Sequence, residues 1–366
     1  MLIEKIKEAF IRRSQTSTRD RLGAADAERL AHMFAAMKNG SIHTQPSRYW
    51  EELNKMNMAQ LRQNGYENFK RTIALNYFTW TRLLPWDSQI LFLCGKLPIG
   101  TLLDAAIRTF RYGRQSYFSA TSIPQALAYS FLTMLQWSYL SRLSLNSRLL
   151  KLREPPQGNP PLVQARGGLK LSQDLANSIL EYDSFSPAMP ERPAVVLELG
   201  AGYGRNAFVV LKIHADVKYI VVDIPPALWV AERYLSEVFP ERTIFRFRDF
   251  EDFAQVSEKF DKADIVFLLA SQISCLPDRL CDLILNISSL HEMRAEQISY
   301  YFEQFDRTLR IGGHMYMKQW RHAKVLFEGT SLVESDYPVP LGWDTVFSRV
   351  ARVQTRFFEA LYKKSR

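Results

Sequence analysis

Residues 195–227 read VVLELGAGYGRNAFVVLKIHADVKYIVVDIPPA, and this stretch decides the fold. An apolar run is followed by three glycines in five residues, Gly200, Gly202 and Gly204, and then by a helical pattern. A second apolar run, rich in β-branched residues, ends at Asp223. Such runs are typical of strands buried on both faces of a parallel sheet. The stretch therefore predicts a strand, a tight glycine turn, a helix and a second strand.

The spacing of the glycines indicates which kind of ligand the turn binds. The dinucleotide fingerprint G-x-G-x-x-G places its third glycine three residues after the second. Here the pattern is G-x-G-x-G, with an acidic residue two positions before the first glycine. Asp223 follows the last glycine by 19 residues, where a carboxylate accepts hydrogen bonds from ribose hydroxyls. The candidate cofactor ligands in this stretch are Glu198, Gly200, Gly202, Gly204, Arg205 and Asp223.

The remaining C-terminal half alternates short apolar runs with helical patterns. This alternation predicts a doubly wound, mostly parallel, Rossmann-like α/β sheet over residues 190–366. Residues 1–160 are helical in pattern and rich in Leu, Ala and aromatics. They predict a helical N-terminal domain or cap that forms a lid and an acceptor pocket. Residues 161–189 are expected to hold a linker helix over the cofactor site.

The third strand of the sheet has two candidates. DIVFLL, residues 264–269, is favoured because its distance to the next apolar run suits consecutive strands. In that case Ser271 and Gln272 are candidates for the adenine of the cofactor. TIFRFRDF, residues 243–250, is the alternative, and it would give that role to Asp249 and Phe250. Asn286, at the end of the next strand, is a further cofactor candidate.

The segment NISSLHEM places His291 and Glu292 just beyond the fourth predicted strand. Ligands of a doubly wound sheet bind outside the carboxyl ends of its strands. An imidazole with an ordinary pKa near 6.5 suits a general base at neutral pH, so His291 is the first candidate. Glu292 is expected to be the base itself, to orient His291, or to hold a substrate hydroxyl. The alternative is that both residues simply begin a polar helix.

Two further segments supply candidate ligands. SQD, residues 172–174, begins a helix upstream of the first strand, and Gln173 is a candidate for the cofactor and Asp174 for the acceptor. YMKQW, residues 316–320, places Lys318 and Trp320 at the end of a late strand, where an aromatic face can stack on a sugar ring. Ordinary helix capping and core packing are the competing interpretations of these residues.

Composition and charge narrow the class of protein. The chain has 366 residues, 47% hydrophobic residues and three cysteines without metal-ligand spacing, which favours a globular protein of a reducing, cytoplasmic compartment. No apolar run is long enough for a membrane span, and no metal site is expected. The net charge of +9 is uneven, because residues 1–160 carry 22 Lys and Arg against 11 Asp and Glu. A scattered, solvated basic surface is the preferred explanation.

The E-x-G-x-G-x-G pattern around LELGAGYGR resembles motif I of class I S-adenosylmethionine (SAM) methyltransferases. From about residue 50 to 320 the chain also resembles the sugar O-methyltransferase family of bacteria. That resemblance rests on NGYENFKRTIALNYF, GNPPLVQARGGLKLSQDLANSILEY, LELGAGYGR and LILNISSLHEMRAEQISYYF. It implies SAM as the methyl donor, S-adenosylhomocysteine as the product, and a hydroxyl of a sugar or glycosylated metabolite as the acceptor.

Three other functions compete with this hypothesis. The basic N-terminal half permits an RNA methyltransferase, although no RNA-binding module or dense basic strip with interleaved aromatics is present. A nicotinamide-dependent oxidoreductase is disfavoured by the glycine spacing. A scaffold that has lost catalysis is disfavoured by the intact glycine motif. The expected partner is therefore a small saccharide acceptor, and nucleic acid is not favoured. A homo-oligomer is possible.

Overall fold

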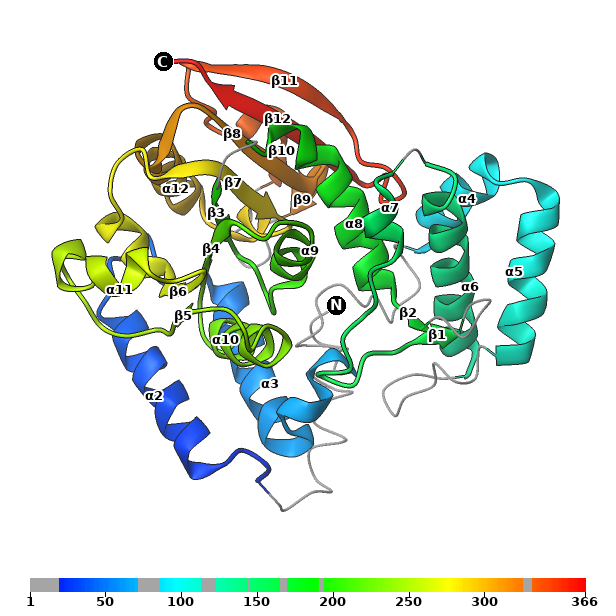
Figure 1. The fold of residues 1–366 in the computed structure, drawn as a ribbon, viewed down its shortest axis with the longest axis horizontal. Coiled ribbons are helices and arrows are strands. Elements are labelled where there is room, and N and C mark those ends of the chain that lie inside the picture. The colour runs from blue at the N-terminus through cyan, green and yellow to red at the C-terminus, as the bar shows by residue number, and fades with distance from the viewer. Residues whose placement is uncertain are drawn as a thin grey trace.

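A computed structural model describes residues 20–71, 86–112, 123–143, 145–164, 170–190, 194–324 and 331–366. Its centre is an eight-stranded sheet (Figure 1) with the order β11-β12-β8-β7-β3-β4-β6-β5. Six neighbouring strands run parallel, and β12 and β11 add an antiparallel edge. The strands are β3 (Ala194–Leu199), β4 (Val217–Asp223), β5 (Ile244–Phe245), β6 (Ile265–Leu269), β7 (Cys281–Ile287), β8 (Leu309–Trp320), β11 (Trp343–Val350) and β12 (Phe357–Lys364).

Helices cover both faces of this sheet, and alternate side chains of each strand enter different cores. In β3, Val196 packs into one apolar core with α8, α9 and α10, whereas Leu197 packs into the other with α11 and α12. Both side chains are fully buried, as the continuous apolar run requires. These helices are α8 (Gln173–Phe185), α9 (Arg205–Ile213), α10 (Ala227–Val238), α11 (Ser257–Asp261) and α12 (Ala295–Thr308).

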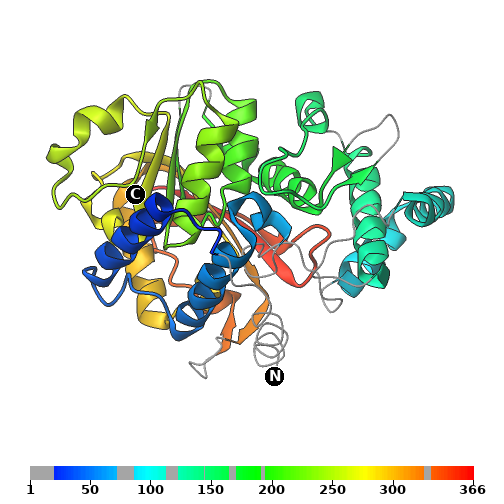
Figure 2. The same ribbon diagram turned by 90° about the horizontal axis from the view of Figure 1, so that it is seen from below.

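The N-terminal part is helical, as predicted, but it forms two separate groups. Helices α2 and α3 lie together against the α/β part, whereas α4, α5 and α6 stand to one side beyond α8 (Figures 1 and 2). Arg29 on α2 forms a 2.6 Å ion pair with Glu232 on α10, which fixes the first group to the sheet domain. The bounds are α2 (Ala24–Lys38), α3 (Arg48–Asn64), α4 (Trp86–Lys96), α5 (Ile99–Tyr112), α6 (Ile123–Leu140) and α7 (Ser147–Leu150).

Two small antiparallel pairs complete the fold: β1 (Val163–Gln164) with β2 (Lys170–Leu171), and β9 (His322–Lys324) with β10 (Ser331–Val333). Short 3₁₀ turns also occur, of which η7 (Leu290–Glu292) and η8 (Glu334–Asp336) bear on the site. Among the described residues, no helix combines the length and the hydropathy that crossing a bilayer requires.

The predicted fold class, a mostly parallel Rossmann-like sheet with helices before it, is confirmed. DIVFLL forms β6 and pairs directly with β4, as the preferred interpretation requires. TIFRFRDF supplies only the two residues of β5, which pair with β6 at the sheet edge. Helix α2, which begins at Ala24, lies within the residues 1–160 that are helical in pattern. Part of the NGYENFKRTIALNYF segment and the first 19 residues fall outside the described residues.

Candidate functional site

The glycine turn joins the end of β3 to the start of α9. Gly200, Gly202 and Gly204 all have left-handed backbones, with φ of +74°, +61° and +86°. Residues with a Cβ adopt this conformation only at a cost, so all three positions favour glycine. At Gly200 there is also no space, because a Cβ there would lie 2.4 Å from the Oγ of Ser289. The turn is therefore bent tightly beside the carboxyl end of the central strand.

Asp223 ends β4 next to this turn. One carboxylate oxygen accepts a 2.7 Å hydrogen bond from the backbone N–H of Gly202, and the other accepts one of 2.7 Å from Ile224. The side chain is 9% exposed, and burial raises its pKa to about 7. No cation pairs with it among the described residues. The carboxyl group thus retains acceptor capacity at the edge of the turn.

Glu198 lies beneath the turn, inside the fold. Its carboxylate accepts hydrogen bonds from Tyr219 Oη at 2.7 Å and from Asn206 Nδ2 at 3.1 Å. It is 2% exposed, and burial raises its pKa to about 7. The glutamate therefore connects β3, β4 and α9, and its side chain is engaged within the protein at this predicted cofactor position.

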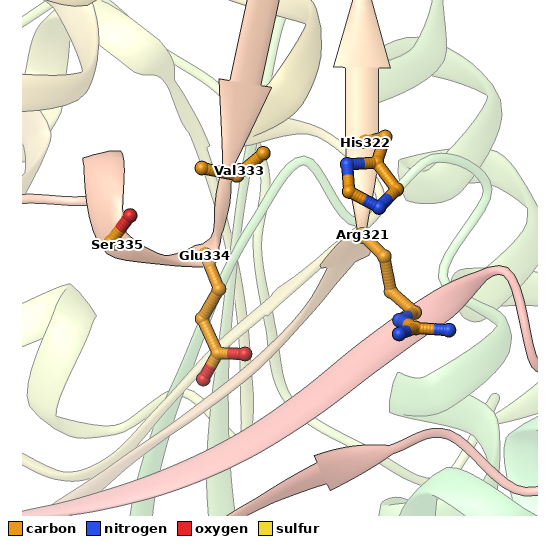
Figure 3. A pocket seen from close by; sticks show the side chains of 5 residues that line it. All are labelled: Arg321, His322, Val333, Glu334 and Ser335. Atoms are coloured by element: carbon orange, nitrogen blue, oxygen red, sulfur yellow. The ribbon is translucent and has the colours of Figure 1, made fainter.

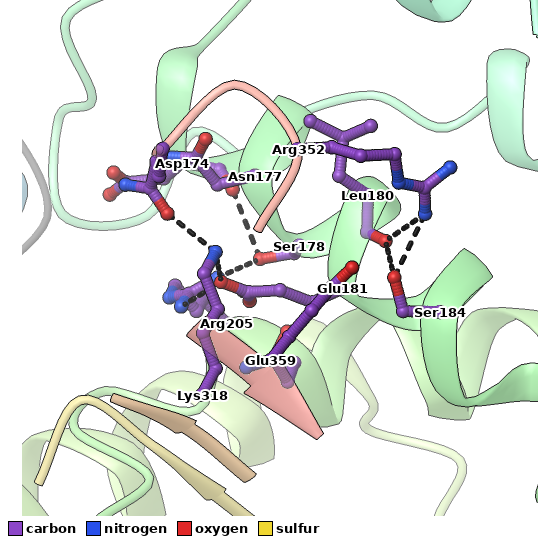
Figure 4. Close-up of polar contacts among 12 residues, drawn as sticks. Asp174, Asn177, Ser178, Leu180, Glu181, Ser184, Arg205, Lys318, Arg352 and Glu359 are labelled. Carbon is purple, nitrogen blue, oxygen red and sulfur yellow. Dashed lines mark hydrogen bonds and ion pairs between the residues drawn. The ribbon is translucent and has the colours of Figure 1, made fainter. Parts of the chain in front are cut away.

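Arg205 and Lys318 meet the same buried carboxylate, that of Glu181 on α8 (Figure 4). Arg205 donates two hydrogen bonds to it, at 2.5 and 3.1 Å, and Lys318 donates one at 2.8 Å. Lys318 also donates to Gln354 Oε1 at 2.5 Å. All three charged side chains are at most 4% exposed. The predicted cofactor role of Arg205 and substrate role of Lys318 thus coincide with a buried ion cluster that joins α8, α9 and β8.

The start of α8 brings unpaired polar groups close to the glycine turn. The Ser172 hydroxyl caps the helix by accepting from the Leu175 N–H at 3.0 Å. Tyr203, within the glycine turn, donates a 2.9 Å hydrogen bond to Oδ2 of Asp174, whose pKa burial raises to about 6. Oδ1 of Asp174 and both amide atoms of Gln173 are buried and have no hydrogen-bond partner in the described structure. Polar atoms of this kind are uncommon in folded proteins, and a ligand or an ordered water would satisfy them.

His291 lies in η7, at the end of β7, and its protonation is fixed by a chain of amides. Its Nδ1 is 2.8 Å from Gln319 Oε1, and Gln319 Nε2 donates to Asn286 Oδ1 at 2.5 Å. Since Gln319 Oε1 only accepts, Nδ1 carries the proton and Nε2 is a free base. His291 is 6% exposed, and burial lowers its pKa to about 4. The imidazole is therefore neutral at pH 7.

Glu292 is adjacent, with Oε1 3.6 Å from His291 Nε2. Burial raises its pKa to about 8, and the charge of Asp223 contributes to that shift, which places the two acids within electrostatic range. The first turn of α3 covers this point, because Ser47 Oγ donates to the Glu292 carbonyl at 3.0 Å. Trp50 of α3 also hydrogen bonds with the Glu292 side chain. The covering α3 residues were not predicted, since no motif marks them and they are about 245 residues away in sequence.

The other predicted site residues lie at the expected strand ends but differ in how far contacts within the fold engage their side chains. Gln272 accepts from the Leu269 N–H and donates to the Arg248 carbonyl, which uses its amide within the turn after β6. Ser271 lies two residues beyond the end of β6, beside Gly40 of the N-terminal part. Asn286 donates to the Leu199 carbonyl and accepts from Gln319, so its side chain is engaged in the fold. Trp320 packs on Phe357 with ring centroids 4.8 Å apart and lies 6.2 Å from His291.

Within the described ranges, no three His, Cys, Asp or Glu side chains are grouped as a metal site would require. Tyr203 was not predicted, although its place between two of the glycines was visible in the sequence.

Comparison with known proteins locates similar folds. No family model and no curated protein sequence matches the chain. A SAM-dependent methyltransferase of Aquifex aeolicus is 11% identical, with a match over 50% of this chain and 89% of that one and a TM-score of 0.34. The 1,6-didemethyltoxoflavin N1-methyltransferase of Burkholderia thailandensis is 16% identical, over 52% and 76% of the two chains, with a TM-score of 0.32. At this level the likeness assigns no function to the chain.

Proposed function

We propose that the protein is a SAM-dependent methyltransferase, and that it methylates a hydroxyl of a sugar or glycosylated metabolite. The environment of Asp223 carries the proposal. This acid is buried, has no cationic partner among the described residues, and accepts only backbone N–H groups. A vicinal pair of ribose hydroxyls would supply the donors that such a carboxylate lacks. Three left-handed glycines beside it allow close approach of a ligand to the backbone.

The start of α8 fits the other end of the cofactor. Gln173 has an unpaired amide N–H₂ and an unpaired amide oxygen, and Asp174 has one unpaired carboxylate oxygen. A group with both a carboxylate and an ammonium, as in the methionine part of SAM, matches these donors and acceptors. Tyr203 connects Asp174 to the glycine turn through its 2.9 Å hydrogen bond. SAM would supply a methyl group already activated by its sulfonium.

His291 and Glu292 supply the base that a sugar hydroxyl requires. The amide chain through Gln319 leaves Nε2 of His291 unprotonated, so it can accept the proton of the hydroxyl. The α3 segment over Glu292 would limit the access of water to this point. The proposal that the acceptor hydroxyl belongs to a sugar rests on the resemblance in sequence. No contact among the described residues favours the RNA methyltransferase alternative.

Calorimetric titration with S-adenosylhomocysteine tests the proposal. We expect binding by the native protein and none by Asp223→Ala. Asp216→Ala is the matched control, since Asp216 is an exposed acid at the other end of β4 and should leave binding unchanged. Binding by Asp223→Ala with unchanged affinity would remove the basis of the assignment, and binding of NAD instead would favour an oxidoreductase.

A further inference from the structure

An open pocket of about 490 Å³ lies beyond the end of β8, between β9 and η8 (Figure 3). It is lined by Arg321, His322, Val333, Glu334 and Ser335. In Figure 3 the side chains of Arg321 and Glu334 extend to the same side, past the end of the β9–β10 pair. None of these residues belongs to the cofactor site described above. The pocket therefore offers a separate set of charged and hydroxyl groups.

The pocket adjoins the candidate base. Arg321 directly follows Trp320, whose ring lies 6.2 Å from that of His291. Strand β9, which contributes His322, packs against η7, the turn that carries His291 and Glu292. Tyr337 directly follows η8, and the charge of Glu292 contributes to the rise of the Tyr337 pKa that burial causes. The β9 side of the pocket therefore lies next to the turn that carries the groups proposed to act on the acceptor.

The walls hold polar groups that the described structure does not pair. Arg321 and His322 form no hydrogen bond or ion pair through their side chains with any described residue. Glu334 is held by a hydrogen bond from the Ser348 hydroxyl, which leaves its other carboxylate oxygen to accept from a ligand. Donors and acceptors in this combination suit a polyhydroxylated ligand.

The exposed arginine of the pocket indicates the charge of the ligand. The Arg321 N–H donates a 2.9 Å hydrogen bond to the carbonyl of Arg356, so two arginines are adjacent on neighbouring chain segments. Neither guanidinium is paired with an acid in the described residues, and both side chains are exposed. A planar guanidinium binds carboxylate or phosphate in a bidentate manner. An anion on the ligand would therefore pair with the exposed guanidinium of Arg321, which lines the pocket.

We propose that this pocket binds the acceptor, and that the acceptor is a saccharide bearing an anionic group, a carboxylate or a phosphate, held by Arg321. His322 and Glu334 then bind sugar hydroxyls and direct one of them toward His291. This inference rests on the proposed function, because it gives the substrate class of the same enzyme.

The test compares three probes on the protein saturated with S-adenosylhomocysteine: glucuronic acid, glucose 6-phosphate and neutral glucose. Calorimetry or saturation-transfer NMR measures each dissociation constant. We expect at least one anionic sugar to bind about tenfold or more tightly than glucose, the scale of one charge-assisted hydrogen bond. Whichever anion binds more tightly identifies the carboxylate or the phosphate as the recognised group.

Arg321→Gln should abolish this preference for the anionic sugar, whereas Glu334→Gln should weaken the binding of all three sugars to the same extent. Arg62→Gln, an exposed arginine at the far end of α3, is the matched control and should retain the preference. The proposal is overturned if glucose binds as tightly as both anionic sugars, if none of the three binds, or if Arg321→Gln keeps the preference. If the native protein fails to bind S-adenosylhomocysteine, the proposed function fails. The same comparison of the three sugars on the protein alone then still shows whether the pocket prefers an anionic sugar.

Discussion

Replacing Glu181 by Gln should destabilise the protein far more than replacing its cationic partner Lys318 by Met. The native carboxylate faces two buried cations, Arg205 and Lys318, at 2.5 and 2.8 Å. The substitution would leave both cations buried without a counter-charge. Breaking one buried pair typically costs about 3–5 kcal/mol, so we expect a loss of at least that size in the free energy of unfolding.

Lys318→Met gives the matched comparison. It removes one cation and the hydrogen bond to Gln354, but the bidentate pair between Arg205 and Glu181 remains. Because a methionine of similar length also avoids the cost of burying an ammonium, the expected loss is about 1–2 kcal/mol. The double variant Glu181→Gln, Lys318→Met should then be more stable than the sum of the two losses predicts, since the residues are coupled.

Urea unfolding followed by circular dichroism measures these differences, and titration with S-adenosylhomocysteine gives the affinity of each folded variant. Arg205 and Lys318 hold the pKa of Glu181 below its usual value despite its burial. Its stabilisation is therefore present above the ordinary carboxyl pKa and lost as pH falls through the lower folded pKa, where native and variant should converge. Equal losses for Glu181→Gln and Lys318→Met, or loss of cofactor affinity in folded Lys318→Met, would refute a purely structural role for this cluster.

Three further outcomes are expected. Gly202→Val should abolish binding of S-adenosylhomocysteine, measured by calorimetry, because valine is strained at φ +61°. His291→Ala should retain that binding while turnover with an accepted sugar falls about a hundredfold or more; full activity would place the base elsewhere. Between pH 5.5 and 8.5 the midpoint of thermal unfolding should fall, because burial raises the pKa of Asp223 and Glu198 to about 7 and of Glu292 to about 8. Stability linked to a raised pKa is full below the unfolded value and lost as pH rises through the folded one, so Asp223→Asn should flatten the decline.

Local pattern was sufficient to predict the sheet. Strands β3, β4, β6 and β7 are predominantly apolar runs, as burial on both faces favours. The glycine turn was equally predictable, because only glycine adopts its three left-handed backbones at little cost. The two-residue β5 was harder to place, since TIFRFRDF alternates apolar with charged residues and pairs at the sheet edge.

The partners of the polar residues were not predictable from pattern. Lys318 lies 137 residues from Glu181, and Ser47 lies 245 residues from Glu292. Spacing in sequence reports which strand end a residue occupies, but not which distant charge neutralises it. For this reason the sequence suggests ligand binding for Arg205, Lys318 and Glu198, whereas the structure places their charged groups in contacts within the fold.

The structure also bears on which member of the His291–Glu292 pair is the base under the proposed function. Burial moves their pKa values in opposite directions, to about 4 for His291 and about 8 for Glu292, so at pH 7 the proton resides on the carboxyl group. Nε2 of His291 is then the unprotonated group, and the amide chain through Gln319 and Asn286 keeps the proton on Nδ1. Asn286 thus acts as a positioning residue for the imidazole.

If His291 acts as the base without help from the Glu292 charge, kcat/KM is flat between pH 6 and 9. If the Glu292 carboxylate takes part, either as the base or by stabilising the imidazolium, kcat/KM rises through about pH 8. A buried imidazole with a low pKa is a weak base, and the short distance of 3.6 Å to Glu292 lets the neighbouring carboxylate stabilise the imidazolium once that carboxyl has lost its own proton. The two groups therefore act best together above neutral pH. An alkaline optimum of kcat/KM follows from the same burial that separates the two pKa values.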